Sequence, residues 1–113
     1  MLPEERNAAF LWDMLSYCRE IIDTTKNLSF EEYMGDRNLR LATERRIEII
    51  GQAAGSVSES FRRTHPEIPW AKIIAQRNIL AHEYGEIKQE LVFRLAIIHI
   101  PELAETLQNL LPD

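Results

Sequence analysis

The sequence predicts an all-α protein, an antiparallel bundle of about five helices in a single domain over residues 1–113. Along most of the chain, apolar residues recur three and four positions apart, which is the spacing of an amphipathic helix. No segment alternates apolar and polar residues as a half-buried strand would. Only four glycines and five prolines interrupt the 113 residues, so we expect long elements with few connections. Short connections favour antiparallel neighbours.

The first helix is expected from about Glu4 to Leu28. Its apolar residues form two adjoining stripes that together make one wide apolar face. Because Cys18 lies on this face, we expect it in the core. As the only cysteine, it cannot form an internal disulfide, which fits a reducing compartment. The two stripes consist of Phe10, Leu11, Met14, Leu15, Tyr17, Cys18, Ile21 and Ile22.

The second and third helices are predicted from their caps. Ser29 with Glu32 three residues later forms the pattern of a capping box, and Gly35 is expected to end the short helix that follows. Asp36 can then cap a long third helix that runs to about Arg63. The apolar stripe of this third helix is Ile47, Ile50, Ala54, Val57 and Phe61.

Prolines separate the third helix from the fourth. Pro66 and Pro69 lack backbone donors, so residues 65–69 are expected to form a connection, with His65 as a loop residue. A proline suits the first turn of a helix, so the fourth helix is expected from Trp70, a core anchor, to about Ala81. Gly85 is expected to mark the next break.

The fifth helix is expected from about Lys88 to Ile100 and is apolar on almost every side. Such a helix lies either at the centre of a bundle or in a subunit interface, and we expect His99 to be a packed or interface residue. Pro101 starts or kinks the last helix. The expected buried edge of that helix is Leu103, Leu107 and Leu110.

Charge and hydropathy exclude several classes of protein. The net charge of −5 argues against a non-specific nucleic-acid binder, although a local basic cleft is compatible with it. No apolar run is long enough to span a bilayer, and the first residues lack the layout of a signal peptide. We therefore expect a cytoplasmic protein without membrane contact. No spacing of histidine, cysteine and carboxylate residues resembles a zinc site, so neither a metal nor another cofactor is expected.

The fourth helix contains an arginine within its apolar stripe. An unpaired buried guanidinium would cost several kcal/mol, so Arg77 must have a carboxylate partner or face a cleft. Asn78 and His82 lie four positions apart on the neighbouring stripe, and Tyr84 follows closely. Arginine can bind a phosphate with forked donors, and histidine can transfer protons near neutral pH. Together these residues suit phosphodiester cleavage without a metal.

A structural explanation of the same residues also exists. His82 would then cap the end of its helix, and Arg77 would form an ion pair with Glu44 or Glu48. On spacing alone, this explanation is favoured over a catalytic site.

The segment Arg77–Tyr84, RNILAHEY, matches the motif of HEPN domains: Arg, four residues, His, any residue, Tyr. It resembles the HepT form of that motif, which includes the asparagine after the arginine. Residues 49–54 (IIGQAA) and 65–70 (HPEIPW) also resemble HepT segments and occur in the same order. The resemblance covers most of the chain. Gly85 is a small departure, because an aromatic residue would also be acceptable there.

The resemblance implies a helical ribonuclease that forms a two-fold homodimer. Arg77 and His82 would be catalytic, and Asn78 would help to arrange them. It also implies a toxin whose antitoxin is a cognate minimal nucleotidyltransferase, which can transfer AMP to Tyr84. RNA is the implied substrate, with tRNA the first to test. The fifth and last helices are preferred over the first as the dimer interface.

The alternative is a non-catalytic dimeric adaptor that presents substrate or nucleotide to the nucleotidyltransferase. An apolar fifth helix and an acidic surface fit that alternative about equally well. A plain helical interaction domain, with Arg77 in a structural ion pair, is a third hypothesis.

Overall fold

The computed structural model describes residues 3–82 and 89–112, and every regular element in these ranges is helical, as the sequence predicted. Of the side chains in these ranges, those of residues 3, 4, 77–79, 81 and 82 lie outside the description. The elements are α1 (Pro3–Thr25), α2 (Phe30–Met34), α3 (Arg37–Ser56), α4 (Glu59–Thr64), α5 (Trp70–His82), α6 (Gln89–Arg94), the π-helix η1 (Leu95–His99) and α7 (Ile100–Leu110).

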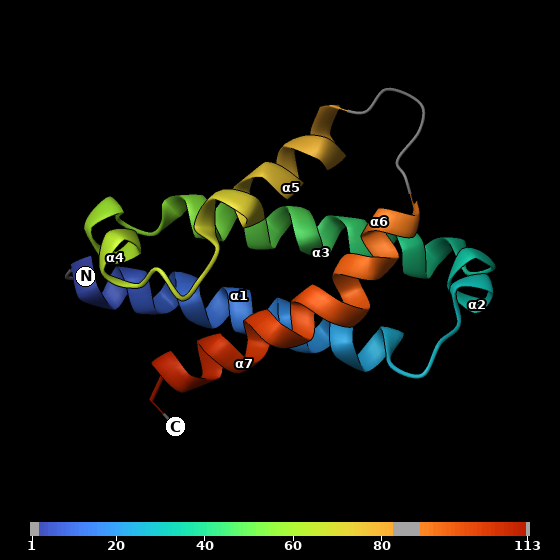
Figure 1. Cartoon of the computed structure of the whole chain (residues 1–113), viewed down its shortest axis with the longest axis horizontal. Helices are drawn as coiled ribbons and strands as arrows, with labels where there is room; N and C mark the ends of the chain where they lie inside the picture. The colour runs from blue at the N-terminus through green and yellow to red at the C-terminus, as the bar shows by residue number, and fades with distance from the viewer. Residues whose placement is uncertain (1–2, 83–88, 113) are drawn as a thin grey trace.

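The long helices run alternately in opposite directions (Figure 1). The central helix α3 is antiparallel to α1 and packs against both α1 and α5, while α7 packs on α1. The α6, η1 and α7 segments follow one another without a turn and form a single bent rod. The fold is therefore an antiparallel helical bundle.

Local side-chain chemistry determines where several helices begin and end. Ser29 Oγ accepts from the Glu32 N–H (3.0 Å) while Glu32 Oε1 accepts from the Ser29 N–H (2.9 Å), which confirms the capping box. Asp36 caps α3 by accepting from the backbone of Leu39 (3.0 Å). Helix α1 stops at Thr25, slightly earlier than expected, and Asn27 then adopts a left-handed conformation with φ of 65°.

The prediction of one continuous third helix to Arg63 is wrong. Helix α3 ends at Ser56, and α4 begins after Ser58, whose side chain accepts from the Phe61 N–H (3.3 Å). Asn7 of α1 stabilises this break from a distance. Its Oδ1 accepts from the Ser58 N–H, and its Nδ2 donates to Ser58 Oγ, both at 3.0 Å. The Ser58 N–H that a continuous helix would use internally is thus bonded to another helix.

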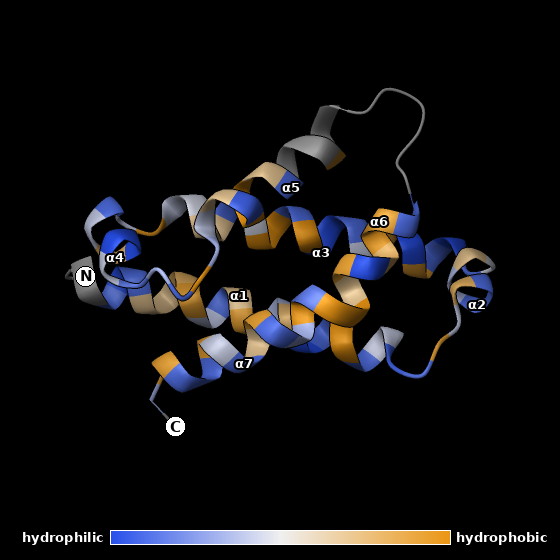
Figure 2. Cartoon of the chain, in the orientation of Figure 1, coloured by the Kyte–Doolittle hydropathy of each residue, from blue (hydrophilic) through white to orange (hydrophobic). Residues whose placement is uncertain are grey.

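The predicted apolar stripes form the core, and Figure 2 shows hydrophobic residues recurring along each of the long helices. The stripes of α1 and α3 are buried or partly buried throughout, and α7 contributes its predicted edge. The largest fully buried side chains include Met14, Leu15, Cys18, Ile21, Tyr33, Ile50, Ile68 and Leu107.

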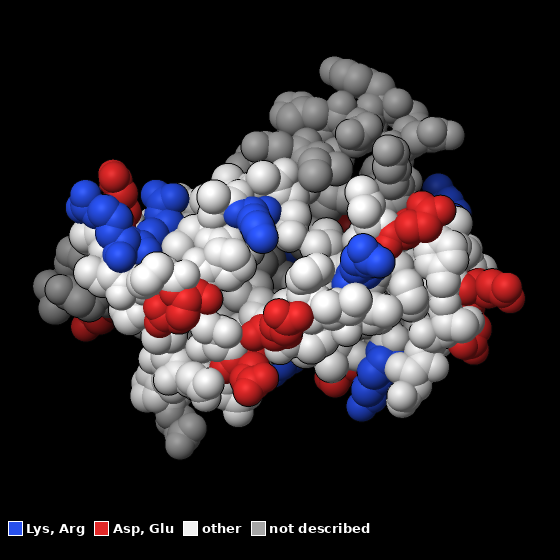
Figure 3. Space-filling view, viewed as in Figure 1, with Lys and Arg blue, Asp and Glu red and all other residues white. Residues whose placement is uncertain are grey.

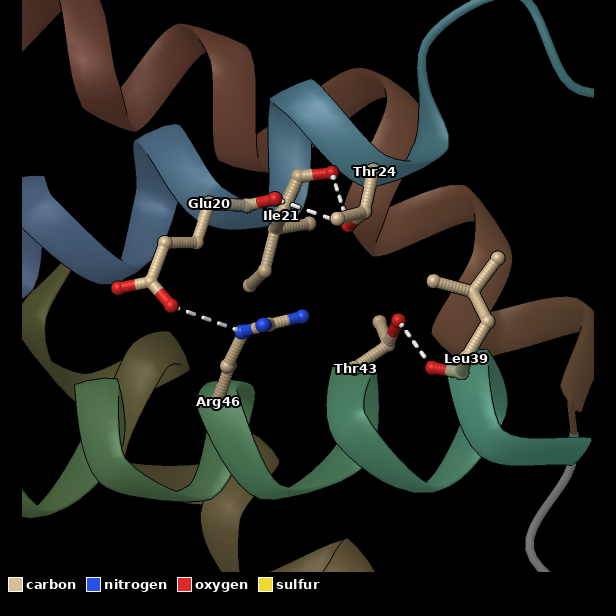
Figure 4. A network of polar contacts seen from close by, with 6 residues as sticks. All are labelled: Glu20, Ile21, Thr24, Leu39, Thr43 and Arg46. Carbon is tan, nitrogen blue, oxygen red and sulfur yellow. Dashed lines mark hydrogen bonds and ion pairs between the residues drawn. The ribbon is translucent and has the colours of Figure 1, made fainter.

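At the α1–α3 contact, threonine hydroxyls donate within their own helices and one ion pair joins the two helices (Figure 4). Buried Thr43 donates to the Leu39 carbonyl of its own helix (2.8 Å), so its hydroxyl is not left unpaired in the core. Arg46 reaches from α3 to Glu20 of α1, with Nε 3.3 Å from Oε1. Glu20 is partly exposed, so this ion pair contributes little stability. Packing, rather than charge, holds the two helices together.

The C-terminal rod differs from the prediction of a fifth helix that ends at Ile100. The Ile100 N–H donates to the Leu95 carbonyl, five residues back, which widens one turn into a π-helix. Pro101 explains this widening, since it has no N–H to donate and its ring would clash with the Ile97 carbonyl in a regular helix. Helix α7 begins at Ile100, with Pro101 in its first turn, as the sequence suggested.

The rod buries only one side in this chain. Val92, Phe93 and Ala96 are buried, whereas Leu91, Ile97 and Ile98 are each more than two-fifths exposed. The rod is therefore not the centre of the bundle. Of the two positions predicted for this apolar helix, the subunit interface remains as a prediction. In the described parts of the chain, no helix is both long and apolar enough to cross a membrane.

The buried Cys18 thiol makes stability depend on alkaline pH. Burial raises its pKa from the ordinary 9.0 to about 12. The thiol's contribution is therefore complete below pH 9 and is lost as pH rises toward 12, because the unfolded chain ionises first. We expect Cys18 to lower the free energy of unfolding by up to about 1.4 kcal/mol per pH unit in that window.

Urea unfolding at several pH values measures this slope. Cys18→Ala should unfold more easily at neutral pH, because it leaves a small cavity, but with a flatter alkaline slope. Met14→Leu changes the same buried face without a titrating group and should keep the wild-type slope. Parallel slopes for wild type and Cys18→Ala would contradict the prediction.

Candidate active site

Helix α5 carries the predicted motif from Arg77 to His82, and its first turn is firmly anchored. Trp70 is buried, and its indole Nε1 donates to the His65 carbonyl (3.0 Å). The His65 ring stacks on Phe61 of α4, with centroids 4.1 Å apart, and bonds Glu67 (3.1 Å). This confirms His65 as a structural loop residue and Trp70 as a core anchor. The connection thereby fixes where α5 begins.

The buried face of α5 packs on α3. Ile73 is buried one turn after Pro69, and Ile74 and Leu80 are partly buried. Arg77 follows Ile73 by four positions, so its backbone lies one turn further along the same side of the helix. The predicted helix is confirmed, and its arginine occupies a register position close to the packed stripe.

The backbone of α5 includes three of the four predicted site residues. Arg77 and Asn78 lie inside the helix, and His82 is its last residue. Asn78 and His82 are four positions apart and share a side, while Arg77 and His82 are separated by about 7.5 Å along the axis at 1.5 Å per residue. Their side chains, and Tyr84 and Gly85 altogether, lie outside the described residues.

The two carboxylates proposed as ion-pair partners of Arg77 have other partners in the structure. Glu48 pairs with Arg45 on α3 at 2.8 Å. Glu44 accepts from Gln89 Nε2 at 2.7 Å. The Arg77 side chain lies outside the described residues, so neither contact tests its pairing. The structural explanation of Arg77 therefore stays a prediction.

Glu44 is also part of a polar chain that fixes the start of α6. The Tyr33 hydroxyl donates to Gln89 Oε1 (2.9 Å), and Gln89 then donates to Glu44. Tyr33 is fully buried, and burial, followed by the charge of Glu44, raises its pKa above the ordinary value. The hydroxyl stays protonated and remains a donor. These hydrogen bonds join α2, α3 and α6, and Gln89 follows the motif closely in the sequence.

Sequence reasoning missed a cavity beside α5. It has a volume of about 370 Å³ and lies between α5 and the bend of the C-terminal rod. Helix α5 and the residue before it contribute Pro69, Lys72, Ile73 and Gln76. The rod contributes His99, Ile100, Glu102 and Leu103. Figure 3 shows this face, where basic side chains gather over α4 and acidic ones over α7.

One of the two alternatives predicted for His99, a packed residue, is wrong. It is exposed at the end of η1 rather than packed, and it borders the cavity, while a role in an interface stays a prediction. Cys18 is a free, buried cysteine, as expected. Among the described residues, no group of three or more histidine, cysteine and carboxylate side chains could hold a metal.

Comparison with known proteins assigns the family. The family model described as "Ribonuclease HepT-like" matches residues 14–110. A protein of Methanocaldococcus jannaschii named "Putative RNase" is 30% identical over 112 residues, which covers 99% of this chain and 93% of the relative. No solved structure gives a significant match.

Two further relatives come from other organisms. A "Putative RNase" of Caldanaerobacter subterraneus subsp. tengcongensis is 32% identical over 90% of this chain and 91% of its own length. The "Probable ribonuclease HepT" of Thermococcus cleftensis is 30% identical over 89% of this chain and 92% of its own length. With the family model matching most of the chain, this protein belongs to the HepT-like ribonuclease family.

Proposed function

We propose that this chain is a metal-independent endoribonuclease toxin that acts as a homodimer. One observation supports the proposal most directly: the family match includes the end of α5, where Arg77, Asn78 and His82 follow one another within two turns. A rigid helix with an anchored start is a suitable support for groups that must keep their spacing.

Arg77 would bind the phosphate that is cut. Its guanidinium stays charged at any physiological pH, and its forked donors match two phosphate oxygens. In the transition state, negative charge increases on these oxygens, so the same contacts become stronger. Asn78 shares a side of α5 with His82 and would orient either the imidazole or the phosphate.

His82 would transfer the proton. As a base, it removes the proton of an RNA 2′-hydroxyl, whose oxygen attacks the neighbouring phosphorus; the bond from phosphorus to the 5′-oxygen breaks, and the leaving oxygen gains a proton. One histidine cannot easily serve as base and acid in the same step. A two-fold dimer would bring a second His82 to a shared cleft and supply the missing group.

A cognate nucleotidyltransferase would act as antitoxin by modifying Tyr84. The phenol oxygen would attack the α-phosphorus of ATP, pyrophosphate would leave, and the phenol proton would pass to solvent or a base. An anionic, bulky adduct close to His82 in the sequence would block and repel an RNA phosphate. The modification therefore explains inhibition in terms of charge and size.

Cleavage without metal is the first expected result. The purified chain, made without its antitoxin, should cut total tRNA in excess EDTA, with fragment ends mapped. His82→Ala should lower the rate about 10²–10⁴-fold through loss of proton transfer, and Arg77→Ala should also lower it strongly. His65→Ala, at a structural loop histidine, should stay active.

Melting temperatures separate the remaining hypotheses. A catalytic Arg77 that faces water predicts a nearly unchanged melting temperature for Arg77→Ala, whereas a buried ion pair predicts a loss of several kcal/mol. Equal cleavage by wild type and His82→Ala would point to a contaminant or another site. A folded, unmodified dimer that cuts nothing would favour the adaptor.

The dimer is expected to form through the C-terminal rod. Leu91, Ile97 and Ile98 are exposed at 49%, 43% and 43%, and they lie on α6 and η1. Ile98→Asp should convert the dimer to monomer in analytical ultracentrifugation, because a buried unpaired charge is costly at an interface. Trp12→Asp, at an exposed apolar residue of α1, is the matched control and should stay dimeric. The opposite pattern would move the interface to the first helix.

Modification of Tyr84 is tested by mass spectrometry. Incubation with the purified nucleotidyltransferase and ATP should add one AMP to the wild-type chain and abolish cleavage. Tyr84→Phe should gain no mass and keep its cleavage activity in the same mixture. If Tyr17→Phe gains no mass in the same mixture, the modified residue is Tyr17 on α1. That outcome would contradict the assignment.

A further inference from the structure

We propose that the cavity between α5 and the bend of the C-terminal rod binds a nucleotide of the RNA strand that flanks the cleaved phosphate. The inference extends the proposed function, because it assigns a substrate-binding subsite to residues outside the motif. The cavity's volume of about 370 Å³ falls in the usual range for sites that bind small organic groups.

The cavity combines the contacts that a single-stranded nucleotide needs. Ile73, Ile100 and Leu103 give it an apolar floor, against which the face of a base can pack. Lys72 is exposed at its edge and supplies positive charge for a phosphate. Gln76, one turn after Lys72, offers both a donor and an acceptor to a base edge.

His99 completes the cavity from the opposite side. An exposed imidazole can stack on a base or donate a hydrogen bond to it. The π-helix determines its position, because one widened turn directly before Pro101 sets the register at which the rod continues. π-bulges are frequent at functional sites. The same structural irregularity that accommodates the proline thus presents His99 to the cavity.

The cavity lies close to the motif along α5 but on a different side of the helix. Lys72 and Arg77 are five positions apart on α5, about 7.5 Å along the helix axis and about 140° around it at roughly 100° per residue. This distance is comparable with roughly two nucleotide rises of 3.4 Å in a stacked strand. A strand held at Arg77 would therefore have to curve around α5 to place a neighbouring nucleotide in the cavity. In a protein with net charge −5, such local contacts would have to replace a broad basic surface.

The negative charge of Glu102 lets the test distinguish an RNA occupant from a basic protein occupant. It is exposed at the cavity edge, so it repels a phosphate and would attract a basic protein segment. An RNA occupant predicts that neutralising Lys72 weakens binding and that neutralising Glu102 strengthens it. A basic protein occupant predicts the reverse for both.

The experiment measures binding rather than cleavage. The probe is a short, fluorescein-labelled 2′-O-methyl oligoribonucleotide of mixed sequence, which has no free 2′-hydroxyl to attack the phosphate. Fluorescence anisotropy with the full chain should give a Kd that rises roughly three- to tenfold in Lys72→Gln, with the salt dependence of log Kd reduced by about 1. Glu102→Gln should lower the Kd by about twofold.

Lys26→Gln is the matched control, because Lys26 is also exposed but does not line this cavity. It should leave the Kd within about twofold of wild type. Circular dichroism and ultracentrifugation should show that all variants keep their fold and assembly state.

The outcomes distinguish this inference from the proposed nuclease. If Lys72→Gln and Glu102→Gln behave like Lys26→Gln, or shift the Kd with reversed signs, the subsite is refuted even when His82→Ala abolishes cleavage. If the predicted opposite shifts appear but wild type cuts no RNA, the subsite stands and the catalytic assignment fails. A wild-type chain that does not bind the probe refutes the subsite as well.

Discussion

The packing of α3 between α1 and α5 is the interaction on which the other features depend. Its apolar stripe removes Ile47, Ile50 and Ala54 from water, and each of the two isoleucines contributes about 1.5–3 kcal/mol when buried. Because α3 touches both neighbours, it sets the distance between α1, which supports the C-terminal rod, and α5, which carries the motif. The cavity lies between the rod and α5, so its width follows from the same packing. Packed helices thus support both the cavity and the positions of Arg77, Asn78 and His82 on α5.

Features with a local cause could be predicted from the sequence. The capping box at Ser29, the cap at Asp36 and the start of α5 after Pro69 each depend on residues within one helical turn. Helical spacing likewise identified the core face of α1, because burial follows periodicity in an amphipathic helix. The motif itself came from resemblance. Physical reasoning alone showed only that Arg77 was out of place in an apolar stripe.

Features that depend on distant residues could not be predicted. The break after α3 is bonded by Asn7, which is 51 positions away from Ser58, although the cap at Ser58 followed by Glu59 was a usable local signal. The widened turn at Leu95–His99 has no periodic signature, and only Pro101 hinted at it. The cavity unites residues that are more than twenty positions apart, so Lys72 and Gln76 had no reason to be singled out before the rod was placed.

The bonds between Asn7 and Ser58 have a consequence for how the molecule opens. Chain ends usually fray, because few contacts hold them. Here the early part of α1 is tied by two hydrogen bonds to the corner between α3 and α4, and that corner leads directly through Phe61 and His65 to Trp70. We therefore expect the early part of α1, the corner and the first turn of α5 to open together as one unit. Slow hydrogen exchange would then extend to the turn of α1 that contains Asn7. Loss of that turn would destabilise the start of α5.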